Sequence, residues 1–303
     1  MNCYLRSTEE KEYLKVLMMQ IRKDHPTMNG VAMYYKINPV TMGRDKFLKL
    51  CKEMGFVVKQ KPRFRGTTDS RGVIRFPNLM QSAAITNMNQ AFCSDITYYE
   101  VNGAYYYITF IMDCYSRRIL GHSVSGRLLT EHTTLPALKQ AIKSRKPELP
   151  RGIIFHSDGG GQYYDSAFLE LTHKYHFKNS MCEYAYENGK AERINGVIKN
   201  NYLRFKQIDS LKDLVREVDC AVYKYNYEKP HKELRHFTPL AYEKKLLSLQ
   251  QQTKPTMTES FDAKTQDLWG VEPQNPEQTK PQNQDVFSAK TNEKNVREVV
   301  NLF

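Results

Sequence analysis

A short hairpin signal constrains the fold of this chain more than any other feature. Asn102-Gly103 separates two runs rich in aromatic and β-branched residues, 91–100 and 104–113. An Asn-Gly pair between such runs indicates a two-residue turn joining antiparallel strands. A third run of this kind, 119–125, follows a short turn. The sequence therefore predicts a sheet that begins with three consecutive antiparallel strands.

Helix and strand patterns alternate further along the chain. Helices are predicted at 131–145 and 166–176, and short buried strands at 152–157 and 177–181. Alternation of this kind places helices on the faces of a sheet. The predicted fold class is α/β, a mixed five-stranded sheet with flanking helices.

The N-terminal part reads as a small helical region. A helix is predicted at 8–22, and a second one begins near Thr41 and ends at Gly55. Two helices, a turn and a basic exit are typical of a helix-turn-helix-like DNA-binding region, which we assign to 1–60, followed by a basic linker at 61–90. A plain helical cap on the next domain explains these helices equally well.

The charge is unevenly distributed along the 303 residues, whose formal net charge is +12. Residues 1–91 hold sixteen basic and seven acidic side chains, a net charge of +9. A basic region fits a polyanion such as nucleic acid, although charge alone does not establish that partner. The candidate DNA-binding side chains in this part are Arg44, Lys46, Arg63 and Arg65.

The C-terminal part changes in composition. We assign 91–249 to a core with C-terminal helices, including a long helix at 210–228. Residues 250–303 are rich in Gln, Thr, Asn and Pro and poor in apolar side chains. Such a segment buries too little surface to offset its ordering entropy, so we predict a disordered polar tail.

Cysteine usage and hydropathy indicate a cytoplasmic protein with no membrane partner. The six cysteines are scattered without a C-x-x-C pair, as expected of reduced thiols, and a zinc site is disfavoured. The charged start, "MNCYLRSTEEKEY", does not resemble a signal peptide. No apolar run approaches the roughly 20 residues that cross a bilayer.

The segment 186–200, "YENGKAERINGVIKN", predicts an amphipathic helix. Its apolar stripe contains Ala191, Ile194, Ile198 and Tyr202, and one flank of the stripe carries Glu192, Asn195 and Lys199. An ordinary surface helix has the same pattern of buried stripe and solvated face. Glu192 therefore becomes a candidate functional residue only if partners come from elsewhere in the chain.

Two aspartates are the candidate partners. Asp95 lies inside a strand otherwise suited to burial, where an acid is costly unless paired or bound to metal. Asp158 ends a strand and precedes three glycines, which permit a tight loop. Each has a simpler explanation, as the cap of a bulge or as a turn residue. Together with Glu192 they form a carboxylate set suited to Mg²⁺.

Five segments in order resemble the orfB-type transposases of bacterial insertion sequences, which carry an integrase-like core. They are "SDITYY", "DCYSR" from Asp113, "HSDGGGQY", "ENGKAERINGVIK" and "YNYEKPHKEL…TP", within a match of about residues 20–245. Three departures stand out. The interval between Asp158 and Glu192 is shorter than is usual in the family, Phe92 replaces a common Trp, and Lys229 replaces Arg.

The resemblance implies an RNase H-like core and a metal-dependent DNA transposase. Asp95, Asp158 and Glu192 would be the catalytic ligands of two Mg²⁺ ions, with Mn²⁺ able to substitute. Water would first free a 3′-OH at an element end, and that hydroxyl would attack a second phosphodiester. The implied DNA-binding and supporting residues are Lys199, Asn195, Gln162 and Asn188.

The resemblance also implies partners. These are the DNA of the element ends and target, the upstream-frame helix-turn-helix protein of the same element, and further copies of the chain on DNA. The protein would then be associated with the bacterial nucleoid. Two alternatives remain open: an RNase H-like nuclease without strand transfer, and a DNA-binding regulator without chemistry.

Overall fold

The computed structural model describes residues 2–58, 76–147, 149–182 and 184–252. The chain divides into two units, 1–254 and 255–303. Arg63, Arg65, the first part of the predicted linker and the predicted tail from residue 253 lie outside the described residues.

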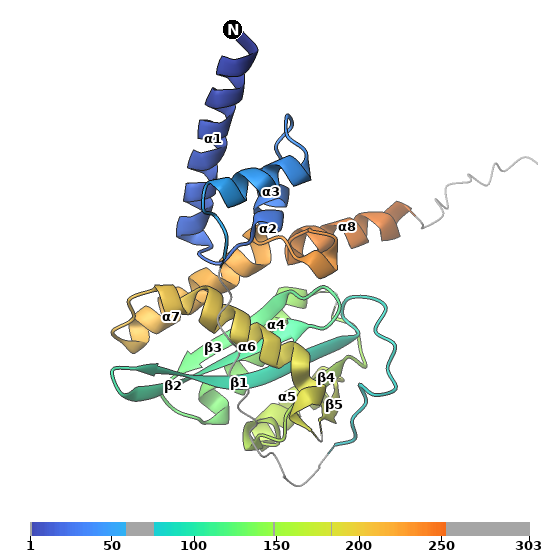
Figure 1. Ribbon diagram of the computed structural model, residues 1–303. Coiled ribbons are helices and arrows are strands. Elements are labelled where there is room, and N and C mark those ends of the chain that lie inside the picture. Colours follow the sequence, from blue (N-terminus) through green and yellow to red (C-terminus); the bar gives the residue numbers. More distant parts are fainter. Residues whose placement is uncertain (1, 59–75, 148, 183, 253–303) are drawn as a thin grey trace, which may run out of the picture. The chain divides into compact units, whose positions relative to one another are not determined.

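Five strands form one mixed sheet (Figure 1). They are β1 (Ala91–Val101), β2 (Ala104–Asp113), β3 (Ile119–Ser125), β4 (Ile154–Ser157) and β5 (Lys178–Met181). Their order is β3-β2-β1-β4-β5; β2 is antiparallel to both β1 and β3, whereas β4 is parallel to β1 and β5. This is the RNase H-like sheet that the resemblance implies, so the predicted fold class is confirmed.

The hairpin between β1 and β2 forms at the expected turn. Val101 pairs with Ala104, which leaves Asn102 and Gly103 as the two loop residues. Their φ values are 51° and 81°. A two-residue hairpin of this twist requires positive φ at both positions, which Asn and Gly tolerate better than other residues. The register of the two longest strands therefore follows from a local sequence signal.

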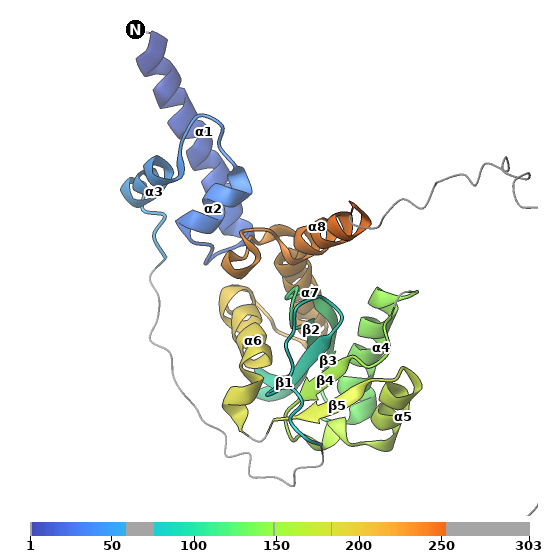
Figure 2. The ribbon, with the colours of Figure 1, turned by 90° about the vertical axis from the view of Figure 1, so that its right-hand side faces the viewer.

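Helices cover both faces of the sheet. Figure 2 shows α6 (Gly189–Asn201) on one side, and α4 (Thr134–Arg145) and α5 (Ser166–Lys174) on the other. The helix α7 (Leu211–Tyr223) shares the hydrophobic core of α6. Side chains of a strand point alternately to the two faces. Accordingly, Cys93 belongs to the core under α6, and its neighbour Phe92 belongs to the core under α4 and α5.

The helical region before the sheet has a hydrophobic core of its own. It comprises α1 (Asn2–Asp24), α2 (Gly30–Ile37) and α3 (Arg44–Glu53). Its fully buried side chains include Met18, Met33 and Phe47. The sequence did not predict α2, because eight residues are too few to display a clear helical period. Asn29 caps its start and Asn38, at φ 52°, ends it.

The C-terminal helices differ in detail from the prediction. The predicted helix 210–228 is α7 followed by a π-helical turn, Lys224–Glu228, in which Lys229 N donates to Lys224 O. The last helix, α8 (Pro239–Gln252), continues three residues past the predicted boundary at 249. The described 3₁₀ turns are Thr130–His132, Gly161–Tyr163, Ala185–Asn188, Leu203–Phe205 and Lys232–Leu234.

Two further expectations concern thiols and membranes. Cys51, Cys93, Cys114 and Cys182 are free and buried, and Cys220 is free and half-buried. Within the described ranges, none of the helices combines the length and apolar character that crossing a bilayer requires.

Gly121 on β3 is a point where strand and helix backbones meet. A Cβ at this position would overlap the carbonyl oxygen of Ala137 and lie 2.8 Å from the amide nitrogen of Ala141. We expect Gly121→Ala to lower the free energy of unfolding by about 1–3 kcal/mol, because α4 must move to relieve the overlap. Gly196→Ala is the matched control: it meets only a side chain at 3.8 Å inside α6 and should stabilise slightly. Urea unfolding of the two variants measures both effects.

Candidate active site

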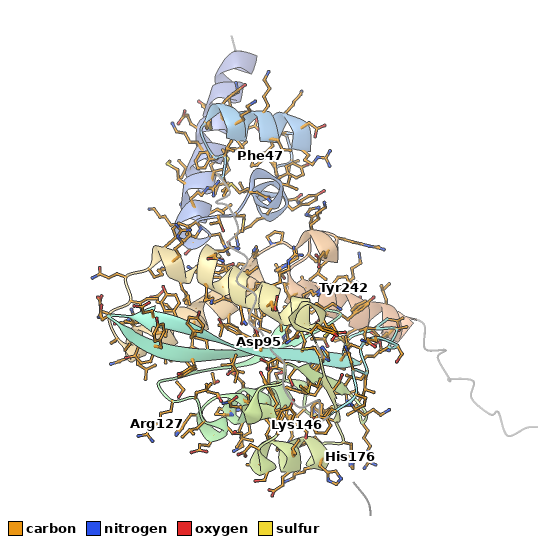
Figure 3. The ribbon with its side chains drawn as sticks, turned by 60° about the horizontal axis from the view of Figure 1, so that its bottom comes forward. Phe47, Asp95, Arg127, Lys146, His176 and Tyr242 are labelled. Carbon is orange, nitrogen blue, oxygen red and sulfur yellow. The ribbon has the colours of Figure 1, made fainter. Side chains whose placement is uncertain are left out.

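Two of the three candidate acids lie where the pairing between β1 and β4 ends. β4 pairs with Ala91, Phe92 and Cys93 of β1, so Asp95 lies two residues beyond the last pair. Asp158 follows β4 directly. The strands are parallel, so the end of β4 delivers Asp158 to the side of β1 that carries Asp95. Figure 3 shows Asp95 on the sheet, beneath α6.

Glu192 comes from the first turn of α6, which packs on β1 and β2. The predicted stripe of α6 is buried, with Ala191 and Ile198 inaccessible to solvent. That stripe fixes the rotation of the helix and leaves Glu192 exposed on its flank. Arg193 points away, as expected, and pairs with Glu233 at 3.2 Å. The three acids thus come from a strand, a loop and a helix.

The pKa of Asp95 reflects its burial and the charges of the other two candidate acids. Burial, then the charge of Asp158, then that of Glu192 raise the pKa of Asp95 to about 7. Asn195 Nδ2 donates to Asp95 Oδ2 at 2.7 Å, which opposes the rise in the pKa without cancelling it. Burial also raises the pKa of Asp158. Negative charge is therefore concentrated here and incompletely compensated by the surrounding protein.

The loop after Asp158 is shaped by its glycines. Gly160 N donates to Asp158 Oδ1 at 3.3 Å, and a Cβ on Gly160 would lie 3.2 Å from that oxygen. Gln162 Nε2 donates to Leu128 O at 3.2 Å, which ties this loop to the connection between β3 and α4. Gln162 thus lies near the acids, and its predicted DNA contact stays a prediction.

Two asparagines support the carboxylates from α6 and its start. Asn195 is buried and holds Asp95, whereas Asn188 is buried and donates to Ser94 O at 2.9 Å. Both contacts fix β1 around Asp95 relative to α6. The observed contacts support a positioning role for these residues, and their DNA contact stays a prediction.

Sequence reasoning missed a second support, formed by Ser94 and Tyr163. The two hydroxyl groups are 2.9 Å apart and buried. Burial and the charges of Asp158 and Asp95 raise the pKa of the Tyr163 phenol well above its usual value. The only sequence signal for it was the tyrosine that closes "HSDGGGQY".

Lys199 lies at the other end of α6 from Glu192. Its Nζ donates to Thr97 Oγ1 at 2.7 Å and to Tyr98 O at 3.4 Å. Burial lowers the pKa of Lys199, and the nearby charge of Asp95 partly offsets this. A lysine ammonium has three donors, so two hydrogen bonds leave one for a further acceptor such as a phosphate oxygen.

Two histidines outside the acid cluster have structural partners. His156 Nδ1 is 3.0 Å from Ser180 Oγ on the neighbouring strand β5. The backbone of His231 bonds Phe237 O, and its ring packs edge-on against Tyr225. Neither arrangement requires a role in catalysis.

Arg44 and Lys46 lie apart from the acids, on α3. They line a cavity of about 620 Å³ together with Tyr34, Tyr35 and Asn38. A basic side chain that contacts a phosphate releases counterions and steepens the salt dependence of binding. We expect the Arg44→Ala/Lys46→Ala variant to lower the slope of log affinity against log salt by about two. Fluorescence anisotropy of duplex DNA over a salt series measures the slope.

The control for this salt dependence is Lys143→Ala, which removes an exposed lysine from α4. It should leave the slope unchanged. A double variant whose slope equals that of the parent chain contradicts the predicted DNA contact of α3.

The carboxylate cluster offers oxygen donors to a metal ion without forming a complete metal-binding group. Among the described residues, no three His, Cys, Asp or Glu side chains form a closed group that could hold a metal ion. The donor chemistry nevertheless fits a hard divalent cation: carboxylate oxygens from Asp95, Asp158 and Glu192, with mutual repulsion left uncompensated around Asp95. A bound cation would remove that repulsion.

Comparison with known proteins identifies the family. Integrase core domain models match residues 86–186 and 174–239. The insertion element IS600 uncharacterized 31 kDa protein of Shigella sonnei is 33% identical over 215 residues, covering 69% of this chain and 77% of that protein. The chain belongs to the insertion-sequence transposases with an integrase core.

Two further proteins are similar to this transposase. The transposase for insertion sequence element IS629 of Shigella sonnei is 24% identical over 242 residues, covering 78% of this chain and 80% of that one. The HTLV-2 integrase catalytic core domain, solved in complex with magnesium, is 22% identical, with a TM-score of 0.42, and covers 51% of the transposase and 96% of that chain. The resemblance stated from the sequence is confirmed.

Proposed function

We propose that this transposase cleaves and joins DNA phosphodiesters at insertion-sequence ends, with Asp95, Asp158 and Glu192 as the catalytic acids. These three carboxylates would be ligands of two Mg²⁺ ions, for which Mn²⁺ can substitute. When bound, a metal pair activates the attacking oxygen and stabilises the leaving one. Family membership supports the reaction class, and the geometry of the acids supports these residue roles.

One observation carries the proposal. Asp95 experiences the charges of Asp158 and Glu192, although the three acids lie at sequence positions far apart and on different elements. Local folding requires an acid at none of these positions. Their convergence at the open edge of β1, with a pKa for Asp95 of about 7, is expected of a site that binds cations.

The remaining side chains hold and orient these acids. Asn195 keeps one oxygen of Asp95 fixed, and the Gly160 amide does the same for Asp158. Asn188 locks the start of α6 to β1, which sets the position of Glu192. Lys199 supplies the free N–H donor for a DNA phosphate. None of these groups needs to form a covalent bond to DNA.

The transposase is proposed to act on DNA of the element ends and target as an oligomer. The upstream-frame helix-turn-helix protein of the same element is proposed as its second partner. Two candidate roles compete: a nuclease that cuts without joining, and a regulator that only binds.

A strand-transfer assay with labelled end DNA distinguishes the transposase, the nuclease and the regulator. We expect cleaved 3′ ends and joined products with Mg²⁺ or Mn²⁺, and neither after chelation. Ca²⁺ should permit binding with little reaction, because its larger and looser coordination shell fits the transfer geometry poorly. Cut ends that never join would favour the nuclease, and bound but intact DNA would favour the regulator.

A further inference from the structure

Two tyrosines are exposed on the β1–β2 hairpin. Tyr98 is 63% exposed and Tyr105 is 54% exposed. Pairing of Glu100 with Tyr105 and of Tyr98 with Tyr107 places both rings on the same face of the sheet. Their ring centroids are 5.6 Å apart and the rings are nearly perpendicular, at 87°. This tyrosine pair leaves aromatic faces available for another flat partner.

The tyrosine pair adjoins the acid cluster. Tyr98 follows Asp95 by three residues on β1, about 10 Å along the strand. That distance corresponds to roughly three base steps of duplex DNA. Strand alternation places the side chains of Asp95 and Tyr98 on opposite faces of the sheet, so a DNA strand would have to cross the edge of β1 beyond Cys93, where the pairing with β4 has ended, to reach both.

Lys199 connects the ring with the acids. Its Nζ lies 5.5 Å from the centroid of the Tyr98 ring, in addition to its bonds to Thr97 Oγ1 and Tyr98 O. Strand alternation places Tyr98 on the α4 side of the sheet, the same side as Ile96. The Lys199 side chain starts from α6, on the opposite side of the sheet. It can reach the Tyr98 ring around the edge of β1, because β4 pairs only with the first three residues of β1.

Positive charge continues on the α4 side of the sheet. Figure 3 shows Arg127 there, on the connection after β3, and its side chain is exposed. The surface around the tyrosine pair thus combines exposed aromatic rings with cationic groups. Nucleic acid has the matching chemistry, because it offers flat bases and phosphates together.

Stabilisation of the hairpin does not account for this arrangement. A cross-strand aromatic pair contributes about 0.2–1 kcal/mol to a sheet. That contribution does not depend on a lysine placed beside one ring, and both rings remain more than half exposed. Bases inside a duplex already stack on their neighbours, so an unpaired base is the one that can offer a free face.

We propose that Tyr98, supported by Tyr105, stacks on an unpaired nucleobase of the DNA strand at the acid cluster while Lys199 binds an adjacent phosphate. This proposal rests on the proposed function, because it assumes that DNA ends enter this site. Stacking on an aromatic side chain then favours DNA ends whose terminal pairs are open.

The test compares two duplexes that differ only at one end. In the first all bases are paired; in the second the terminal nucleotides are mismatched and include 2-aminopurine, whose fluorescence falls on stacking. Binding to the full chain is measured with Ca²⁺ at fixed salt. We expect the parent chain to bind the mismatched duplex more tightly than the paired one and to quench the 2-aminopurine fluorescence. The Tyr98→Leu protein should bind the mismatched duplex about tenfold or more weakly than the parent chain does.

Three variants make the measurement specific. Tyr98→Phe should keep both quenching and preference, since the ring is retained. Tyr223→Leu, which removes a ring of comparable exposure, 54%, from α7, should change neither. Lys199→Ala should weaken both duplexes alike, because a phosphate contact does not read base pairing.

A Tyr98→Leu protein that retains the parental preference for the mismatched duplex, and whose thermal unfolding shows that it is folded, would overturn the stacking proposal. If that protein also changes its oligomeric state, the tyrosine pair is assigned to contact between copies of the chain. Strand joining by the parent chain is assayed separately, so failure of the proposed function is distinguishable from failure of this inference.

Discussion

A Glu192→Gln transposase is expected to bind end DNA but to lose cleavage and joining by about a thousandfold or more. Glutamine preserves the size of the side chain and removes the charge that holds a cation. The lost stabilisation of transition-state charge amounts to several kcal/mol, and each 1.36 kcal/mol corresponds to a tenfold change in rate. Binding of end DNA should be kept or become tighter, because the substitution removes a negative charge from a site that binds phosphates. Gel assays of cleavage and anisotropy of binding, on the same preparation, measure the two quantities.

Lys199→Ala supplies the opposite control for this site. It should weaken binding of end DNA while keeping or slightly raising affinity for the metal alone, since Lys199 bonds Thr97 and Tyr98 and its charge acts on Asp95. If the Glu192→Gln protein joins strands at the parental rate, Glu192 is only a charge on a solvated helix face, and the proposed catalytic set is wrong.

Glu243→Ala is expected to cause the largest loss of stability, about 3–5 kcal/mol. Glu243 on α8 is buried and bonds Arg145 twice, at 2.5 and 2.9 Å, and Arg118 at 2.8 Å. It also accepts from Ser116 Oγ at 2.6 Å. Its removal takes away the carboxylate that Arg118 contacts and leaves Arg145 with the longer contact to Asp113, at 3.5 Å. Denaturant unfolding at neutral pH measures the loss.

The pH dependence gives a second readout of Glu243. Burial raises the pKa of Glu243, but hydrogen bonding and charge from Arg145, with help from Ser116 and Arg118, lower it overall. A depressed pKa stabilises the fold above the ordinary glutamate value, and this contribution disappears as pH falls through the folded-state pKa. The difference between the parent chain and Glu243→Ala should therefore shrink in acid.

Glu233→Ala is the matched control for the Glu243 variant. Glu233 also contacts two arginines, Arg117 at 3.1 Å and Arg193 at 3.2 Å, but its side chain is 49% exposed. An exposed pair contributes about 0–1 kcal/mol, so this variant should unfold almost like the parent. Equal losses for the two glutamates would show that burial does not decide the strength of these pairs.

The sheet was predictable because its signals are local. Strand alternation and the Asn102-Gly103 turn act over a few residues, and they determine the first three strands and the register of the hairpin. The stripe of α6 likewise follows from a helical period within one segment. The short helix α2 and the π-helical end of α7 were missed, since eight residues carry a weak period and the π turn has no distinct local pattern.

Sequence by itself thus determined the strands, the longer helices and the element on which each acid lies. Only the tertiary structure decided which groups surround them. The bonds from Asn195 to Asp95 and from Asn188 to Ser94 join residues about a hundred positions apart, as does the pairing of Arg145 with Glu243. The raised pKa of Asp95 likewise depends on burial and on charges brought in by β4 and α6. Local propensities act within a few residues, whereas burial and charge proximity depend on how distant segments pack.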